Sequence, residues 1–245
     1  MVRVALLLVL GLIIAVAPDP PRVLVFSKTA GFRHASIPDG MKCIKEILGS
    51  DFAVDATEDA TRFTKENLGR YRVVVFLSTT GDVLDAAQQS AFQEYIESGG
   101  GFVGVHAATD TEHGWPWYEE MIGAHFAGHP DIQKATVIVE DRTHASTAML
   151  PDRWDRTDEW YRFNRNPRKV DGIHVLARMD ETTYQGGGMP DDHPCMWWRE
   201  MKSGRSWYTA GGHTKESFSE PLFKEHLRQG IIWASNVAVP AVGKK

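Results

Sequence analysis

The sequence predicts an α/β protein with a doubly wound, mostly parallel sheet. Three strands are expected at residues 23–26, 71–77 and 102–105. Their continuous apolar runs, which in the second strand cover residues 73–77, are typical of strands buried on both faces of a parallel sheet. Between these runs, residues 37–48 and 85–97 carry apolar side chains at helical spacing. Repeated strand–helix–strand units imply right-handed crossovers, which place helices on both faces of the sheet.

The elements of the first half follow in order from this pattern. The helix at 37–48 presents Met41, Ile44 and Leu48 on one face, and Gly49 is expected to end it. Residues 52–54 form a weaker second strand. The helix at 85–97 follows the third strand, and the glycines before residue 102 close it and lead into the fourth strand.

The second half changes character and adds strands joined by turn-rich segments. They are expected at residues 135–139, 172–178, 195–199 and 206–210. An amphipathic helix at 218–234 closes the chain. Because no linker separates the halves, we expect one domain over residues 22–235, with extra strands in its C-terminal half and a tail at 236–245.

The N-terminus has the features of a secretory signal peptide. Arg3 supplies a positive start, residues 4–17 are almost wholly apolar, and a small-x-small pattern ends at Ala17 before a proline-rich segment. We expect cleavage near Ala17 and a secreted or periplasmic protein. The alternative is an uncleaved anchor, although the apolar run is shorter than the ~20 residues that a membrane span needs.

The charge of the chain limits the classes of molecule that it is expected to bind, and its two cysteines leave two possibilities open. The 245-residue chain has 27 basic and 32 acidic side chains, and removal of residues 1–17 takes away only Arg3, which leaves a net charge of −6. A mildly acidic chain without a basic run is a poor nucleic-acid binder, and no stable membrane insertion is expected after cleavage. Cys43 and Cys195 could pair or remain buried thiols. The sequence does not determine the oligomeric state.

Residues 104–111 resemble the strand–turn–helix elbow that presents a nucleophile in α/β hydrolases and amidotransferases. His106 stands where such an elbow carries serine or cysteine. An imidazole can act as a metal ligand or as a general acid or base, or it can simply bond within the turn. Asp110 could orient His106 or cap the following helix, and capping is the favoured interpretation.

Other histidines follow strands or lie in loops that could reach the same sheet edge. His34 follows the first strand and His213 follows a late one, while His129 lies four residues after His125 in a segment rich in glycine and proline. His34, His106, His129 and His213, with Glu159 nearby, could bind a divalent ion such as zinc. Catalysis or substrate binding without a metal, or purely structural roles, remain alternatives.

Aromatic and guanidinium groups accompany these segments. Trp160 and Tyr161 directly follow Glu159, and aromatic faces pack well against the C–H faces of sugars. Arg33 and Arg205 could hold an oxygen-rich ligand through two hydrogen bonds. Packing in the core and surface ion pairs are the plain alternatives for these side chains.

Taken together, the segments resemble the ThuA-like (trehalose utilisation) family over about residues 22–235. The resemblance rests on TAGFRH at 29–34, GVHAA at 104–108, FAGHP at 126–130, DEWY at 158–161, and GR at 204–205 through GHT at 212–214. It implies a flavodoxin-related fold of the class I glutamine amidotransferase-like superfamily. Without cysteine at the elbow, glutaminase activity is not expected.

The resemblance also implies a role in the catabolism of sugars, particularly disaccharides processed through 3-keto intermediates. We therefore expect an enzyme that acts on a small sugar, with His106, His213 and Glu159 as catalytic or ligand residues and Arg33, Trp160, Tyr161 and Arg205 binding substrate. The alternatives are a non-catalytic sugar-binding protein and an accessory subunit of a secreted sugar dehydrogenase.

Overall fold

A nine-stranded mixed sheet forms the centre of the protein, which we describe from a computed structural model over residues 19–238. The expected signal peptide at 1–17 lies outside these residues, as do residues 239–245 of the expected tail. Five neighbouring strands run parallel, in the order β2 (Ala53–Thr57), β1 (Arg22–Phe26), β3 (Val73–Leu77), β4 (Gly101–Val105) and β11 (Gly204–Thr209). This order is that of flavodoxin-like doubly wound sheets.

Four antiparallel strands extend the sheet beyond β11. They follow in the order β10 (Pro194–Met201), β9 (His174–Asp180), β6 (Gln133–Val139) and β7 (Arg153–Asp158). A separate two-stranded sheet pairs β5 (Phe126–Gly128) with β8 (Arg162–Phe163). The α/β class and the extra C-terminal strands are confirmed. The sequence prediction did not include β5, β7, β8 or the two short helices at residues 65–68 and 116–122.

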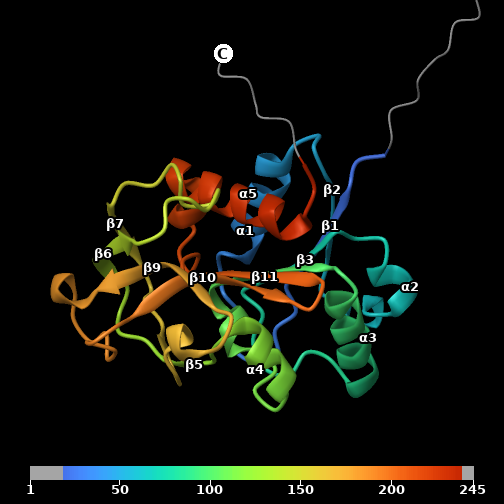
Figure 1. The fold of residues 1–245 in the computed structure, drawn as a ribbon, viewed down its shortest axis with the longest axis horizontal. Helices are drawn as coiled ribbons and strands as arrows, with labels where there is room; N and C mark the ends of the chain where they lie inside the picture. Colours follow the sequence, from blue (N-terminus) through green and yellow to red (C-terminus); the bar gives the residue numbers. More distant parts are fainter. Residues whose placement is uncertain (1–18, 239–245) are drawn as a thin grey trace, which may run out of the picture.

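Helices cover both faces of the sheet. Helices α1 (Ile37–Leu48) and α5 (Pro221–Ser235) lie together on one face, and α3 (Ala86–Glu97) and α4 (Pro116–Ile122) lie on the other (Figure 1). The short α2 (Lys65–Leu68) packs beside α3. Within residues 19–238 no helix is long and apolar enough to cross a membrane.

Local sequence signals explain where the helices begin and end. Asp85 and Gln88 form a capping box at the start of α3, in which each side chain accepts from the other residue's backbone N–H. Gly49 ends α1 with φ of +52°, a conformation that glycine adopts without the cost of a side chain. The central strands β3 and β4 are fully buried, which accounts for their continuous apolar sequence.

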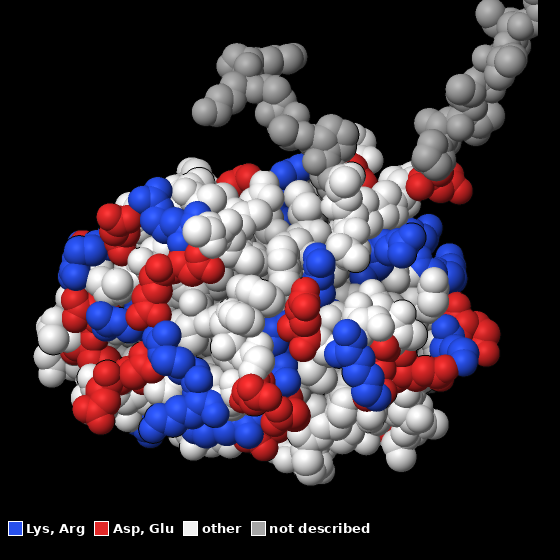
Figure 2. Space-filling model, viewed as in Figure 1, with Lys and Arg blue, Asp and Glu red and all other residues white. Residues whose placement is uncertain are grey.

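Charged side chains are spread over the surface. Figure 2 shows lysine and arginine interspersed with aspartate and glutamate on the face in view, without one large patch of either sign. Both cysteines are buried and free, so the expected alternative of two buried thiols describes them.

Candidate functional site

The turn after β4 has the geometry of an elbow. His106 is fully buried and has φ of +52°, a left-handed conformation that is unusual for a residue with a side chain. Its Nδ1 lies 2.8 Å from the carbonyl oxygen of Ala210. Because a carbonyl only accepts, Nδ1 carries a proton, and Nε2 is the ring nitrogen that faces Glu159 and His213. A short 3-10 turn, His106–Asp110, follows in place of a regular helix.

Three further side chains meet His106 at this edge of the sheet. His34 follows β1, His213 follows β11, and Glu159 comes directly after β7. We call His34, His106, Glu159 and His213 the His/Glu cluster; each offers one ligand atom, and these atoms all lie within 4.8 Å of one another. The carboxyl ends of parallel strands form the ligand-binding edge of doubly wound sheets, and that rule brings three of these segments together.

The shortest distances in the cluster centre on Glu159. Its Oε2 lies 2.9 Å from His213 Nδ1 and 3.5 Å from His106 Nε2, and the two ring nitrogens are 3.2 Å apart. His129 Nδ1 lies 3.1 Å from the other carboxylate oxygen, Oε1, and 2.9 Å from the Pro130 carbonyl. His129, which the sequence grouped with the metal ligands, therefore stands behind Glu159 at the half-exposed rim.

The protonation of the cluster follows from these contacts. Burial opposes the ionisation of Glu159, but hydrogen bonds and charge interactions with His106 and His213 outweigh it and lower the pKa of the carboxyl to about 2. Burial would lower the pKa of His213, yet its hydrogen bond to Glu159 raises it. Burial, helped by the neighbouring imidazoles, lowers the pKa of His34 to about 3. The cluster thus contains a carboxylate and a neutral His34 at neutral pH.

Asp158 holds two parts of the cluster in place. This fully buried carboxylate accepts hydrogen bonds from the backbone N–H groups of Glu159 (3.0 Å) and His213 (3.1 Å). It also accepts from the N–H groups of Gly212 and Thr214 and from the Ser217 hydroxyl. One side chain therefore ties the end of β7 to the loop that carries His213.

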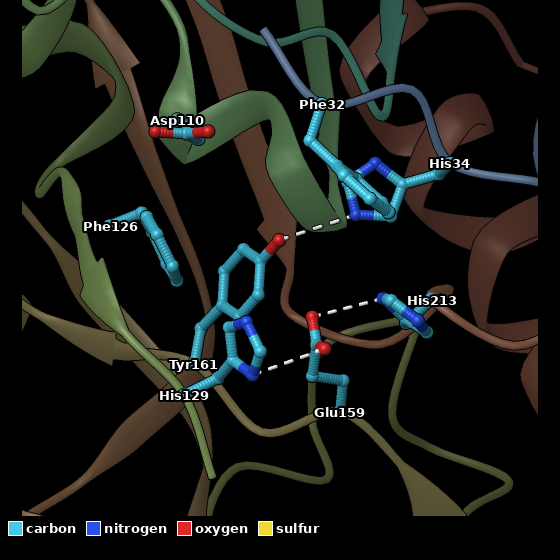
Figure 3. Close-up of a pocket in the computed structure, with 8 residues that line it drawn as sticks. All are labelled: Phe32, His34, Asp110, Phe126, His129, Glu159, Tyr161 and His213. Atoms are coloured by element: carbon cyan, nitrogen blue, oxygen red, sulfur yellow. Dashed lines mark hydrogen bonds and ion pairs between the residues drawn. The ribbon is translucent and has the colours of Figure 1, made fainter. Parts of the chain in front are cut away.

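A cavity of about 290 Å³ opens beside the cluster. Figure 3 shows its lining: Phe32, His34, Asp110, Phe126, His129, Glu159, Tyr161 and His213. Tyr161 lies with its ring centroid 4.1 Å from that of His106 and its hydroxyl 3.5 Å from His34 Nε2. Phe32 is 66% exposed, which is rare for a large apolar side chain among the described residues.

Three residues that the sequence grouped with substrate binding lie apart from this cavity. Arg33 is exposed and bonds the Glu58 carboxylate. Trp160 is buried and donates to the Gln133 carbonyl. Arg205 lies at the start of β11, where it covers the Trp233 ring, whereas the cluster lies beyond the other end of that strand.

Asp110 does not cap a helix. Its Oδ1 accepts from His113 Nε2 at 3.0 Å, and the residue that precedes α4 is Trp115. His125 is also apart from the cluster, since its Nδ1 donates to the Thr109 carbonyl.

Sequence reasoning missed the positions of Phe32, Asp110 and Phe126 in the cavity wall and the role of Asp158. The signal was present for the first three, because each lies close in sequence to a histidine that the sequence analysis had singled out: His34, His106 or His129. For Asp158, neighbouring Glu159 was the more obvious candidate, and only the fold reveals the loop that it binds.

Comparison with known proteins agrees with the fold and the motifs. Residues 22–234 match the family described as "ThuA: Trehalose utilisation". No protein with a curated description matches the chain.

Solved structures give the same result. A ThuA-like protein from Bacteroides uniformis ATCC 8492 is 25% identical, with a TM-score of 0.76 over 91% of this chain and 95% of its own. One from Parabacteroides merdae ATCC 43184 is 20% identical, with a TM-score of 0.72 over 91% and 94%. A β-galactosidase from Bacillus circulans sp. alkalophilus, 12% identical, shares the fold with a TM-score of 0.54 over 88% of this chain and 30% of its own. With a family match that spans nearly the whole described domain, the chain belongs to the ThuA (trehalose utilisation) family.

Proposed function

We propose that this protein is an exported enzyme of carbohydrate metabolism that acts on a disaccharide or 3-keto-glycoside with a divalent metal held by the His/Glu cluster. The observation that carries the proposal is the convergence of four ligand atoms within 4.8 Å beside an aromatic-walled cavity. Export rests on the N-terminal pattern of residues 1–17.

The donor set suits a metal such as zinc. Zinc bonds nitrogen and oxygen at about 2.0–2.1 Å, so a tetrahedral ion holds its ligand atoms about 3.3 Å apart. The distances among His106 Nε2, His213 Nδ1 and Glu159 Oε2 are 2.9, 3.2 and 3.5 Å, close to that spacing. The bond from His106 Nδ1 to Ala210 also matches the way metal-binding histidines are oriented by a carbonyl on their second nitrogen.

The cavity suits a sugar. Phe32, Phe126 and Tyr161 supply aromatic surface for the C–H faces of a pyranose ring, while the cluster and Asp110 supply polar atoms for its hydroxyls. A volume of about 290 Å³ with an open mouth has room for one ring in the cavity and a second toward solvent. The trehalose association of the family agrees with such a ligand.

The chain's own residues would prepare a keto sugar for reaction. A divalent ion bound by the cluster would supply a Lewis acid for the carbonyl group, which acidifies the adjacent C–H. Burial raises the pKa of Tyr161, so its hydroxyl stays protonated and can donate to a substrate oxygen. His129 holds Glu159 through Oε1, and Asp158 holds the backbone of Glu159 and His213.

The test combines metal analysis with turnover. The protein purified without its first 17 residues should bind about one equivalent of zinc or manganese and convert 3-keto-disaccharides by β-elimination or isomerisation. His106→Ala should lose the metal and the activity. Wild-type protein that binds metal but leaves every 3-keto-disaccharide unchanged would contradict the enzymatic proposal, and calorimetric binding of sugar without turnover would establish a sugar-binding protein instead.

A further inference from the structure

The cavity wall away from the His/Glu cluster carries a carboxylate that the cluster does not use. Asp110 ends the turn that begins with His106, and its side chain is 31% exposed and lines the cavity. Figure 3 shows it well apart from Glu159 and His213, with the Tyr161 ring between them in this view. A sugar in the cavity would therefore contact the cluster and Asp110 from different directions.

One oxygen of the Asp110 carboxylate is hydrogen-bonded to an imidazole. Its Oδ1 accepts from His113 Nε2 at 3.0 Å, while within residues 19–238 no hydrogen-bond partner faces Oδ2. The His113 side chain is 45% exposed and its ring stacks on that of His125, with centroids 4.3 Å apart. His113 therefore holds one oxygen of the Asp110 carboxylate, and the other oxygen is left to act on a ligand.

The other polar groups in the cavity wall already have partners or would bind the metal. The ligand atoms of the cluster face one another, so a bound metal would occupy them. The Tyr161 hydroxyl lies 3.5 Å from His34 Nε2, on the side of the cavity that the cluster occupies. His129 Nδ1 is held by the Pro130 carbonyl and by Glu159. Reaction next to a keto group needs a proton acceptor that does not bind the metal, and Asp110 is the carboxylate that remains in the lining.

We infer that Asp110 is the general base that takes the proton from the carbon beside the keto group of a 3-keto-glycoside, and that His113 positions the Asp110 carboxylate; the inference rests on the proposed function. The C–H bond breaks, the proton goes to Oδ2, and the electron pair forms the C=C bond of an enolate as the carbonyl π pair moves to oxygen. Asp110 then releases the proton from Oδ2 to water, while His113 Nε2–H continues to donate to Oδ1.

Two outcomes are open to the enolate. It regains a solvent proton at carbon, or it expels the glycosidic oxygen from the next carbon, and that oxygen takes up a proton from water. An aspartate can act as a base toward such carbon acids when other groups stabilise the resulting oxygen charge.

The experiment follows deuterium uptake from D₂O into 3-keto-trehalose by NMR, with zinc-loaded protein. The wild type should exchange the C–H beside the keto group, and Asp110→Asn should slow this at least 100-fold, in line with the contribution of a general base. Asp110→Asn should keep the wild-type zinc content and bind trehalose within twofold of wild type by calorimetry. The exposed Asp131 provides the matched control, since Asp131→Asn should exchange at the wild-type rate.

His113 has its own test. His113→Ala should slow the exchange without changing the zinc content, because Asp110 loses the donor that positions it. Free imidazole added to the buffer should restore the rate by replacing that donor, a recovery that a purely structural role would not give.

The outcomes separate the two proposals. Asp110→Asn protein that exchanges like wild type overturns the assignment of the base and leaves the proposed function standing. Asp110→Asn protein that loses zinc or trehalose binding also overturns it, because Asp110 would then support binding. Wild-type protein without any exchange overturns both proposals.

Discussion

Asp158→Asn tests whether one buried carboxylate holds the site together. The wild-type side chain is fully buried, forms an ion pair with Arg156 at 3.2 Å, and accepts from four backbone N–H groups and the Ser217 hydroxyl. Asparagine has a single acceptor oxygen, so either orientation of its amide points an NH₂ group at existing donors. The substitution removes acceptors without removing the groups that donate to them.

These contacts set the expected loss in the free energy of unfolding and in zinc affinity. Removing one partner of a buried ion pair costs about 3–5 kcal/mol, and much of that cost comes from donors left without an acceptor. Arg156 keeps a second partner in Glu220, with Nε 3.1 Å from the carboxylate, so the lower end of the range is expected. Displacement of Glu159 and His213 should also weaken zinc binding by about 10–100-fold, as is typical for groups that orient metal ligands.

The assay is urea unfolding of chelator-treated protein, followed by zinc titration against a competing chelator. Asp155→Asn is the control on the same strand, because Asp155 is exposed and its pair with Lys134 should contribute at most about 1 kcal/mol. A loss below about 1 kcal/mol in Asp158→Asn, together with unchanged zinc affinity, would refute the reasoning.

Three further predictions concern other parts of the molecule. Burial lowers the pKa of His226 to about 3, whereas the value in the unfolded chain is about 6.5. Between these two pH values only the unfolded chain binds the proton. The free energy of unfolding should therefore fall as the pH falls from 6.5 towards 3, by up to about 1.4 kcal/mol per pH unit. His226→Gln should reduce this pH dependence, measured by urea unfolding of metal-free protein from pH 7 to 5. If the free energy of unfolding has the same slope against pH in the variant and the wild type, the prediction is wrong. Phe32→Ala should weaken sugar binding by about 2–10-fold in calorimetry, while Phe32→Trp should retain the wild-type affinity. Ile132 is the other large exposed apolar residue in the described part of the chain, so Ile132→Ala is the control and should leave sugar binding unchanged. Gly230→Ala should lower the free energy of unfolding by about 1–3 kcal/mol in urea, although alanine favours helices. The reason is that the added Cβ would lie 2.6 Å from the buried Trp207 ring. A more stable variant would show that the ring moves aside at little cost.

Much of the fold could be predicted from sequence because its central strands are buried on both faces. The runs at residues 23–26 of β1, 73–77 of β3 and 101–105 of β4 contain no polar side chain that would hide their apolar pattern. Strand β7 was missed for the opposite reason. It alternates between exposed and buried residues, but its buried positions are Trp154, Arg156 and Asp158, two of which are charged. Hydrophobic periodicity cannot reveal a strand whose inward face carries an ion pair.

The cluster residues could be proposed from sequence because strand ends converge in a doubly wound sheet. That rule says which edge a residue reaches and leaves the direction of its side chain open. Trp160 and Tyr161 are neighbours in the chain, yet Tyr161 lines the cavity while Trp160 packs beside Arg156 and bonds the Gln133 carbonyl.

Arg205 shows the limit of proximity in sequence. It precedes His213 by only eight residues, but β11 continues for four residues beyond it at about 3.3 Å each, which places Arg205 roughly 13 Å from the end of the strand that leads to His213. The arginine therefore belongs to the edge of the sheet where α5 ends, and its guanidinium bonds the Trp233 carbonyl. Asp110 is the converse, since it shares the His106 turn and so remains at the functional edge. In this fold, a residue in the turn that follows a parallel strand is a better candidate for chemistry than one at the strand's start, however close the two lie in the sequence.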